Sequence, residues 1–178
     1  MSDEPAPPHL ILVGLPGAGK STVGRMVAAR LGRPFVDLDE EIERTERQSV
    51  SAIFAERGEP HFRALEVDRT RWLRTIGPAV VSPGGGWITN AGVVALLRPA
   101  GRIIYLHVTP PAALRRLGAG RSTRPLLERP DPLGEIDRLY ERRDPLYRTA
   151  DHVVETESMS LQDVTTVVAQ LAADLARS

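Results

Sequence analysis

The chain contains no cysteine and only one lysine among its 178 residues. Without cysteine it has no disulfide framework, no thiol nucleophile and no cysteine-based metal site. Basic and acidic side chains each number 23, so the composition gives no general affinity for nucleic acid or an anionic membrane. No apolar run approaches the roughly 18 residues that a membrane span needs. The four histidines are scattered and suggest no metal site.

The chain does have enough apolar sequence for one domain with a sizeable core, since 42% of its residues are hydrophobic. Residues 1–8 are acidic and proline-rich, and we expect them to form a frayed tail rather than a signal or transit peptide. Residues 9–178 would then form the single domain. The lack of cysteine is compatible with a reducing compartment, and we expect a cytoplasmic location.

Residues 14–21 have the sequence GLPGAGKS, which fits the phosphate-loop pattern G-x-x-x-x-G-K-[ST]. The apolar run at 9–13 predicts a buried strand before this loop, and residues 21–31 predict a helix after it that ends at Gly32. Strand, glycine loop and helix is the context that the motif requires. A shuffled chain of this composition carries the pattern on the order of once in a thousand, so a chance match is disfavoured.

Each residue type of the loop has a physical reason. The glycines let several backbone N–H groups turn toward one centre, and the helix N-terminus behind them favours an anion. We expect Lys20 to reach the β- and γ-phosphates of a nucleotide, and the Ser21 hydroxyl to bind Mg²⁺. Every other basic residue is arginine, so the single ammonium group stands where a point charge suits phosphate.

The rest of the chain alternates between strand and helix patterns. Strands are predicted at 34–39, 79–82, 102–108 and 152–155, and helices at 40–44 onward, 50–57, 59–76, 89–97, 110–117, 134–146 and 160–176. This alternation predicts a three-layer α/β/α fold around a five-stranded parallel sheet. Ligands bind outside the carboxyl ends of the strands in such sheets, which is where the phosphate loop lies.

Two further features follow strand ends. Asp37 and Asp39 are two residues apart, so on a strand they would project to the same side and could handle Mg²⁺ or orient an attacking hydroxyl. The alternative is a pair at a helix N-terminus, stabilised by the helix dipole. Three consecutive glycines at 84–86 indicate a close approach of backbone to a ligand. We expect the neighbouring Phe62 and Trp87 to pack rather than to react.

Residues 118–133 show no clear periodicity and hold Arg121, Arg124 and Arg129 among glycines and prolines. Phosphoryl transfer spreads negative charge that a mobile arginine can stabilise, and a lid excludes water. We therefore interpret this segment as a lid. The alternative is an ordinary exposed loop.

The ordered set of motifs resembles the shikimate kinase family over nearly the whole chain. The stretches that carry the resemblance are GLPGAGKST, FVDLDEEIE, GEPHFRALE, the GGG triplet, RPLL and RRDPLYRTAD. The family is similar in fold to nucleoside monophosphate kinases, with strand order 2-3-1-4-5 and a lid. The resemblance implies transfer of the γ-phosphate of ATP to the 3-hydroxyl of shikimate in chorismate and aromatic amino acid biosynthesis, by a cytoplasmic monomer that binds neither nucleic acid nor membrane.

The resemblance also implies a role for each matching residue. Asp39, Lys20 and Arg124 would be catalytic, Asp39 by orienting or deprotonating the acceptor hydroxyl and the other two by stabilising the transferred phosphoryl group. Shikimate would be bound by Asp39, Arg63, Gly85 and Arg143, the two arginines holding its carboxylate. The acceptor region would span about 37–66 and the lid about 118–133. The nucleotide would be bound by Gly17, Ala18, Gly19, Lys20, Ser21, Thr22, Arg116 and Arg124, and Mg²⁺ by Ser21 and Asp37.

Three alternatives stay open. A gluconate kinase or another small-metabolite kinase shares the phosphate loop and a lid, but would not be expected to combine the other motifs in this order. A nucleoside monophosphate kinase is disfavoured by the carboxylate-binding arginines on the acceptor side. A non-catalytic nucleotide-sensing module is disfavoured by the retention of Asp39, Lys20 and Arg124.

Overall fold

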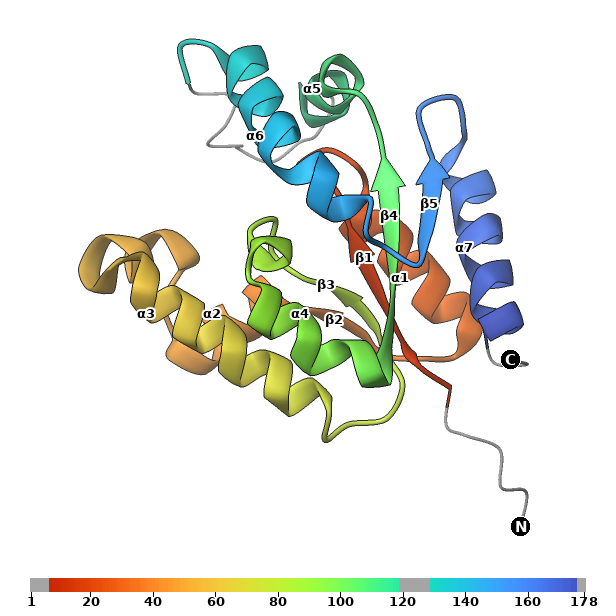
Figure 1. Cartoon of the computed structure of the whole chain (residues 1–178), viewed down its shortest axis with the longest axis horizontal. Helices are drawn as coiled ribbons and strands as arrows, with labels where there is room; N and C mark the ends of the chain where they lie inside the picture. The colour runs from red at the N-terminus through yellow and green to blue at the C-terminus, as the bar shows by residue number, and fades with distance from the viewer. Residues whose placement is uncertain (1–6, 119–128, 176–178) are drawn as a thin grey trace.

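The computed structural model describes residues 7–118 and 129–175. Five strands form one sheet: β1 (His9–Val13), β2 (Phe35–Asp37), β3 (Val80–Ser82), β4 (Gly101–His107) and β5 (His152–Glu155). The helices are α1 (Lys20–Leu31), α2 (Leu38–Glu46), α3 (Val50–Leu73), α4 (Ala91–Leu97), α5 (Pro110–Gly118), α6 (Pro132–Tyr147) and α7 (Leu161–Leu175), with short 3₁₀ helices η1 (Trp87–Thr89) and η2 (Arg98–Ala100). Strands and helices alternate along the chain, as the sequence predicted (Figure 1).

The sheet is parallel throughout, and its order β2-β3-β1-β4-β5 confirms the predicted fold. Helices α1 and α7 pack together on one face, and α3 and α4 pack together on the other (Figure 1). The central strand β1 is therefore covered on both sides, and all five of its residues are buried. Its neighbours are β3, where Ile11 pairs with Val81, and β4, where Ile11 pairs with Ile103.

The expectation that Asp37 and Asp39 share one side of a strand is wrong. Strand β2 ends at Asp37, and Asp39 lies in the first turn of α2. The cause is a helix cap: Asp37 Oδ1 accepts hydrogen bonds from the backbone N–H groups of Asp39 at 3.0 Å and Glu40 at 3.2 Å. The alternative given above, an aspartate pair at a helix N-terminus, therefore describes this local structure. Helix α2 begins at Leu38, two residues earlier than predicted.

Helix α3 is interrupted where the sequence predicted a helix end. Gly58 has φ 78° and ψ 171°, a conformation that favours glycine, and the helix resumes at once with Pro60 in its new first turn. A second small core joins α2 to α3 through the buried Ile42, Ile53 and Phe62. This cluster lies within residues 37–66, the region that the resemblance assigned to the acceptor.

The apolar side chains of the last helix, α7, are buried to different degrees. Val164 and Val168 pack into the core, whereas Leu161 is 50% and Val167 is 37% exposed. Trp87, as expected, is fully buried, and its indole N–H donates to Thr70 Oγ1 at 3.1 Å. Within residues 7–118 and 129–175, no helix is both long and apolar enough to cross a membrane.

The first strand carries a buried histidine that makes stability depend on pH. His9 is 3% exposed, and its Nδ1 accepts a hydrogen bond from the backbone N–H of Ala79 at 3.0 Å. Burial lowers the pKa of His9 below its ordinary value of 6.5, with a smaller lowering contribution from Arg33. Folding therefore selects the neutral imidazole.

We predict that His9 lowers the free energy of unfolding as pH drops below about 6.5, because the unfolded chain then binds a proton at this residue that the folded chain resists. His9→Asn keeps an acceptor near the Nδ1 position but does not titrate. Urea unfolding at pH 7.5 and pH 5.5 should therefore show a smaller loss of stability in His9→Asn than in the wild type. Equal losses in the two proteins would contradict this role of His9.

Candidate active site

The phosphate loop connects β1 to α1 at the carboxyl edge of the sheet. Gly17 and Gly19 have φ values of 84° and 88°, and Gly19 is the residue from which α1 begins. These left-handed conformations fold the loop back, so that the N-terminus of α1 faces the space beside it. Lys20 Nζ donates to the carbonyl oxygens of Gly14 and Leu15, each at 2.9 Å. The loop thus has the form that the motif predicted.

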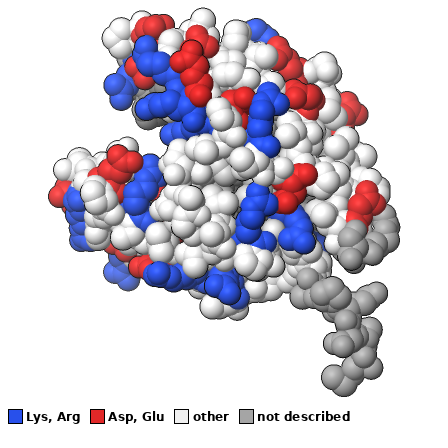
Figure 2. All heavy atoms as spheres, viewed as in Figure 1, with Lys and Arg blue, Asp and Glu red and all other residues white. Residues whose placement is uncertain are grey.

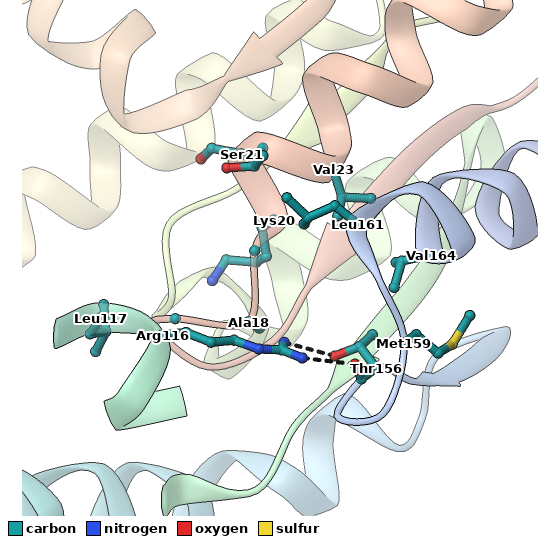
Figure 3. Close-up of a pocket in the computed structure, with 13 residues that line it drawn as sticks. Ala18, Lys20, Ser21, Val23, Arg116, Leu117, Thr156, Met159, Leu161 and Val164 are labelled. Carbon is teal, nitrogen blue, oxygen red and sulfur yellow. Dashed lines mark hydrogen bonds between the residues drawn. The ribbon is translucent and has the colours of Figure 1, made fainter. Parts of the chain in front are cut away.

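A cavity of about 460 Å³ opens beside this loop (Figure 3). The predicted nucleotide residues Gly17, Ala18, Gly19, Lys20, Ser21, Thr22 and Arg116 all line it. The Arg116 guanidinium is held by two hydrogen bonds to Thr156, at 3.0 Å to Oγ1 and 2.7 Å to the carbonyl oxygen. A planar cation fixed at the wall of a cavity offers a flat surface to an aromatic ring.

The far wall of this cavity was not predicted. It consists of Thr156, Met159, Leu161 and Val164, which follow β5 and open α7. Leu161 is half-exposed because it borders the cavity rather than the core. The rule that ligands bind at the carboxyl ends of parallel strands points to residues just after β5, although the side chains themselves carry no motif.

Ser21 and Asp37 meet at the edge of the cavity. The Ser21 hydroxyl donates to Asp37 Oδ2 at 3.2 Å, while Asp37 Oδ1 caps α2. The cap fixes the carboxylate, so that its second oxygen and the hydroxyl are presented together beside the phosphate loop. A hydroxyl and a carboxylate oxygen are the donor types that Mg²⁺ prefers, so these two residues fit the ion.

The glycine triplet brings together the three charged residues predicted on the acceptor side. A Cβ atom on Gly84 would lie 2.6 Å from Asp39 Oδ1, one on Gly85 would lie 2.7 Å from Arg143 Nη1, and one on Gly86 would lie 2.5 Å from Arg63 Nη2. Asp39 comes from α2, Arg63 from α3 and Arg143 from α6. Each glycine therefore leaves room for one charged side chain. Figure 2 shows a hollow in the surface between α6 on one side and α2 and α3 on the other.

Arg63 is oriented by two glutamates. Its Nε and Nη2 donate to Glu59 Oε1 at 3.2 and 2.9 Å, and its Nη1 donates to the buried Glu66 at 2.6 Å. A guanidinium has five N–H groups, so two remain, one on each terminal nitrogen. Those two nitrogens are the atoms that face Gly86. Arg63 is therefore held in place with donors left for a carboxylate ligand.

Asp39 is poised to accept a proton. Its Oδ1 is buried and has no hydrogen-bond partner among the described residues. Burial raises the pKa of Asp39 from 3.8 to about 6, helped by the negative charges of Asp37, Glu66 and Glu43 and opposed by Lys20. A carboxylate with this pKa and an unused oxygen suits orientation or deprotonation of a hydroxyl.

Arg124 and Arg121 lie outside the described residues, as does most of the predicted lid. The described end of that segment begins α6 at Pro132, where Asp131 accepts from the Gly134 N–H at 3.0 Å, two residues before the predicted helix start. His107, on β4, contacts Glu155 and Tyr140.

Comparisons with known proteins agree with this geometry. A family model described as shikimate kinase matches residues 16–172. A shikimate kinase from Xanthomonas campestris pv. campestris is 41% identical over 168 residues, which cover 93% of this chain and 93% of the relative. The chain belongs to the shikimate kinase family. Members of this family are ATP-dependent kinases that act on shikimate.

Solved structures of a shikimate kinase and of a gluconokinase differ in how similar they are to this chain. A shikimate kinase from Acinetobacter baumannii, in complex with shikimate, has a TM-score of 0.85 at 37% identity and covers 96% of this chain and 95% of its own. A gluconokinase from Sinorhizobium meliloti has a TM-score of 0.62 at 18% identity, with 96% of this chain and 94% of its own covered. The second likeness shows a shared fold alone.

We predict that Gly86→Ala raises the KM for shikimate about tenfold, because its methyl group displaces the Arg63 guanidinium and weakens one charge-assisted hydrogen bond. The backbone of Gly86, with φ −86° and ψ −10°, accepts alanine without strain. Gly77→Ala is the matched control, since a Cβ there meets nothing within 4 Å. Steady-state kinetics on both variants measures the difference, and equal KM values would argue against Arg63 facing the acceptor.

Proposed function

We propose that this chain transfers the γ-phosphate of ATP to the 3-hydroxyl of shikimate. The observation that carries the proposal is the meeting of Asp39, Arg63 and Arg143 at the glycine triplet, beside the phosphate loop. Shikimate has a planar carboxylate at one end and hydroxyls at the other. Two guanidinium groups match the carboxylate, and one carboxylate with an unused oxygen matches a hydroxyl.

On the acceptor side, Arg63 and Arg143 hold the shikimate carboxylate, and the Gly85 backbone N–H donates to the substrate. This anchoring sets the distance and angle of the 3-hydroxyl, which is the main contribution that a kinase makes to phosphoryl transfer. Asp39 accepts the hydroxyl proton as the bond between the 3-oxygen and the γ-phosphorus forms and the bond between that phosphorus and the β,γ-bridging oxygen breaks, which releases ADP. Its raised pKa brings the carboxylate closer to the proton affinity that this step requires.

On the nucleotide side, Gly17 to Thr22 surround the phosphates, and Lys20 turns from its loop carbonyls to the β- and γ-phosphates. Arg116, fixed by Thr156, lies against the adenine ring. Arg124 stabilises the charge on the transferred group. Ser21 and Asp37 would hold Mg²⁺, which when bound neutralises charge on the phosphates.

The test of this function is the production of ADP from Mg-ATP in a coupled assay with shikimate, gluconate, a nucleoside monophosphate or no acceptor. We expect turnover with shikimate alone. Turnover with gluconate or a nucleoside monophosphate instead would keep the phosphate-loop assignment and overturn the acceptor site. A folded chain that binds ATP but shows no turnover under any of these conditions would make the nucleotide-sensing module the leading explanation.

Asp39 gives a sharper test of the mechanism. Asp39→Asn should lower kcat at least about 100-fold while ATP binding is retained, because the amide cannot take the hydroxyl proton. In the wild type, kcat/KM should fall as pH drops below about 6, where free Asp39 becomes protonated. Asp68→Asn, at an exposed position on α3, is the control. A wild-type profile that is flat from pH 5 to 7, or unchanged turnover in Asp39→Asn, would contradict the role of Asp39.

A monomeric state and a cytoplasmic location, both implied by the family resemblance, stay predictions. The acceptor region at 37–66 and the lid at 118–133 stay predictions as well.

A further inference from the structure

Tyr147, at the end of α6, has a buried side chain that the mechanism above does not use. It is 1% exposed, and its hydroxyl lies 3.2 Å from the carbonyl oxygen of Gly14 and 3.2 Å from that of Gly85. Gly14 begins the phosphate loop, and Gly85 is the middle of the glycine triplet. One hydroxyl therefore contacts the nucleotide side and the acceptor side at once.

Both of these contacts lead directly to groups that would touch the substrates. The Gly14 carbonyl that faces Tyr147 also accepts from Lys20 Nζ at 2.9 Å. The Gly85 peptide lies against Arg143, because a Cβ on Gly85 would be 2.7 Å from Arg143 Nη1. Arg143 also lies near the Tyr147 hydroxyl, where its positive charge lowers the pKa of Tyr147 against the larger raising effect of burial. A path of contacts thus runs from Arg143 and Gly85 through Tyr147 to Gly14 and Lys20.

The hydrogen-bonding capacity of the Tyr147 hydroxyl explains how it can connect the glycine triplet to the phosphate loop. A phenol has one proton to donate, so at any moment the Tyr147 hydroxyl can serve one of its two neighbouring carbonyls, that of Gly14 or that of Gly85. The Gly14 carbonyl is buried, so a donor must stay beside it when the Lys20 ammonium turns to a phosphate. Tyr147 supplies that donor. A ligand that fixes Arg143 and the triplet also fixes Tyr147 against the phosphate loop, which lowers the ordering cost of the second ligand.

We propose that Tyr147 is a positioning residue that couples the acceptor site to the phosphate loop through its hydroxyl. The inference rests on the proposed function, since it assigns shikimate to the triplet and ATP to the loop. It predicts that shikimate tightens nucleotide binding, and by reciprocity that the nucleotide tightens shikimate binding by the same factor.

The ring of Tyr147 is held independently of the hydroxyl, which makes a clean variant available. Its centroid lies 4.9 Å from that of Tyr105 on β4, and both rings are fully buried. Tyr147→Phe removes the hydroxyl and keeps this packing. Tyr105→Phe is the matched control, because the Tyr105 hydroxyl donates to Asp144 at 2.8 Å and reaches neither loop. Thermal unfolding of both variants reports whether each still folds.

The experiment is isothermal titration of the full chain with the Mg²⁺ complex of a non-hydrolysable ATP analogue, with and without saturating shikimate. In the wild type and in Tyr105→Phe, shikimate should lower the analogue Kd by about fivefold or more. In Tyr147→Phe this factor should fall to within about twofold of one. An unchanged factor in Tyr147→Phe, or an equal loss in Tyr105→Phe, would overturn the coupling role while leaving the proposed function intact.

A wild-type chain that binds shikimate without changing the analogue Kd would also overturn the coupling. Failure of the wild type to bind shikimate at all would instead overturn the proposed function, and the coupling with it. The two failures are therefore distinguished within one set of titrations.

Discussion

The candidate site depends on the absence of side chains at three consecutive positions. Asp39, Arg63 and Arg143 come from three different helices, and each ends where a Cβ of the triplet would otherwise stand. Charged groups can approach a backbone this closely only at glycine. The same approach gives the ligand a floor of peptide groups, with N–H donors that do not change protonation. The three charged side chains can therefore meet on the acceptor side only because residues 84–86 leave the space that side chains would fill.

The close packing at the triplet also brings acidic side chains into a partly buried site, which raises their pKa values. Asp39 and Glu66 are both withdrawn from water, and burial raises the pKa of each above its ordinary value. Glu66 is compensated by Arg63 at 2.6 Å, whereas Asp39 Oδ1 has no hydrogen-bond donor among the described residues. An ionised Asp39 whose Oδ1 has no donor destabilises the fold. Under the proposed function a substrate hydroxyl would supply that donor, so the free protein would already favour binding of a hydroxyl at this position.

Features set by local chemistry could be predicted from the sequence, and features set by distant contacts could not. The phosphate loop was predictable because its glycines, lysine and serine act within eight residues, and the sheet order came from family resemblance and was confirmed. The start of α2 was mispredicted because the β pattern at 34–39 continues past Asp37, whose cap ends the strand. The cavity wall after β5 was missed because its side chains carry no motif. The two contacts of Tyr147 were missed although it lies in the stretch RRDPLYRTAD, because the resemblance gave this tyrosine no role and its partners come from two loops that are distant in sequence.

Strand order explains why one residue can reach both substrate loops. The phosphate loop follows β1 and the glycine triplet follows β3, and these strands are direct neighbours although some 70 residues separate them in sequence. Neighbouring strands lie about 4.8 Å apart, so the two loops leave the sheet side by side. Helix α6 then ends above them, with Arg143 one turn before Tyr147 on the same face. The topology itself thus brings the phosphate loop and the glycine triplet together, and α6 supplies both Arg143 at the triplet and the Tyr147 hydroxyl that lies against the two loops.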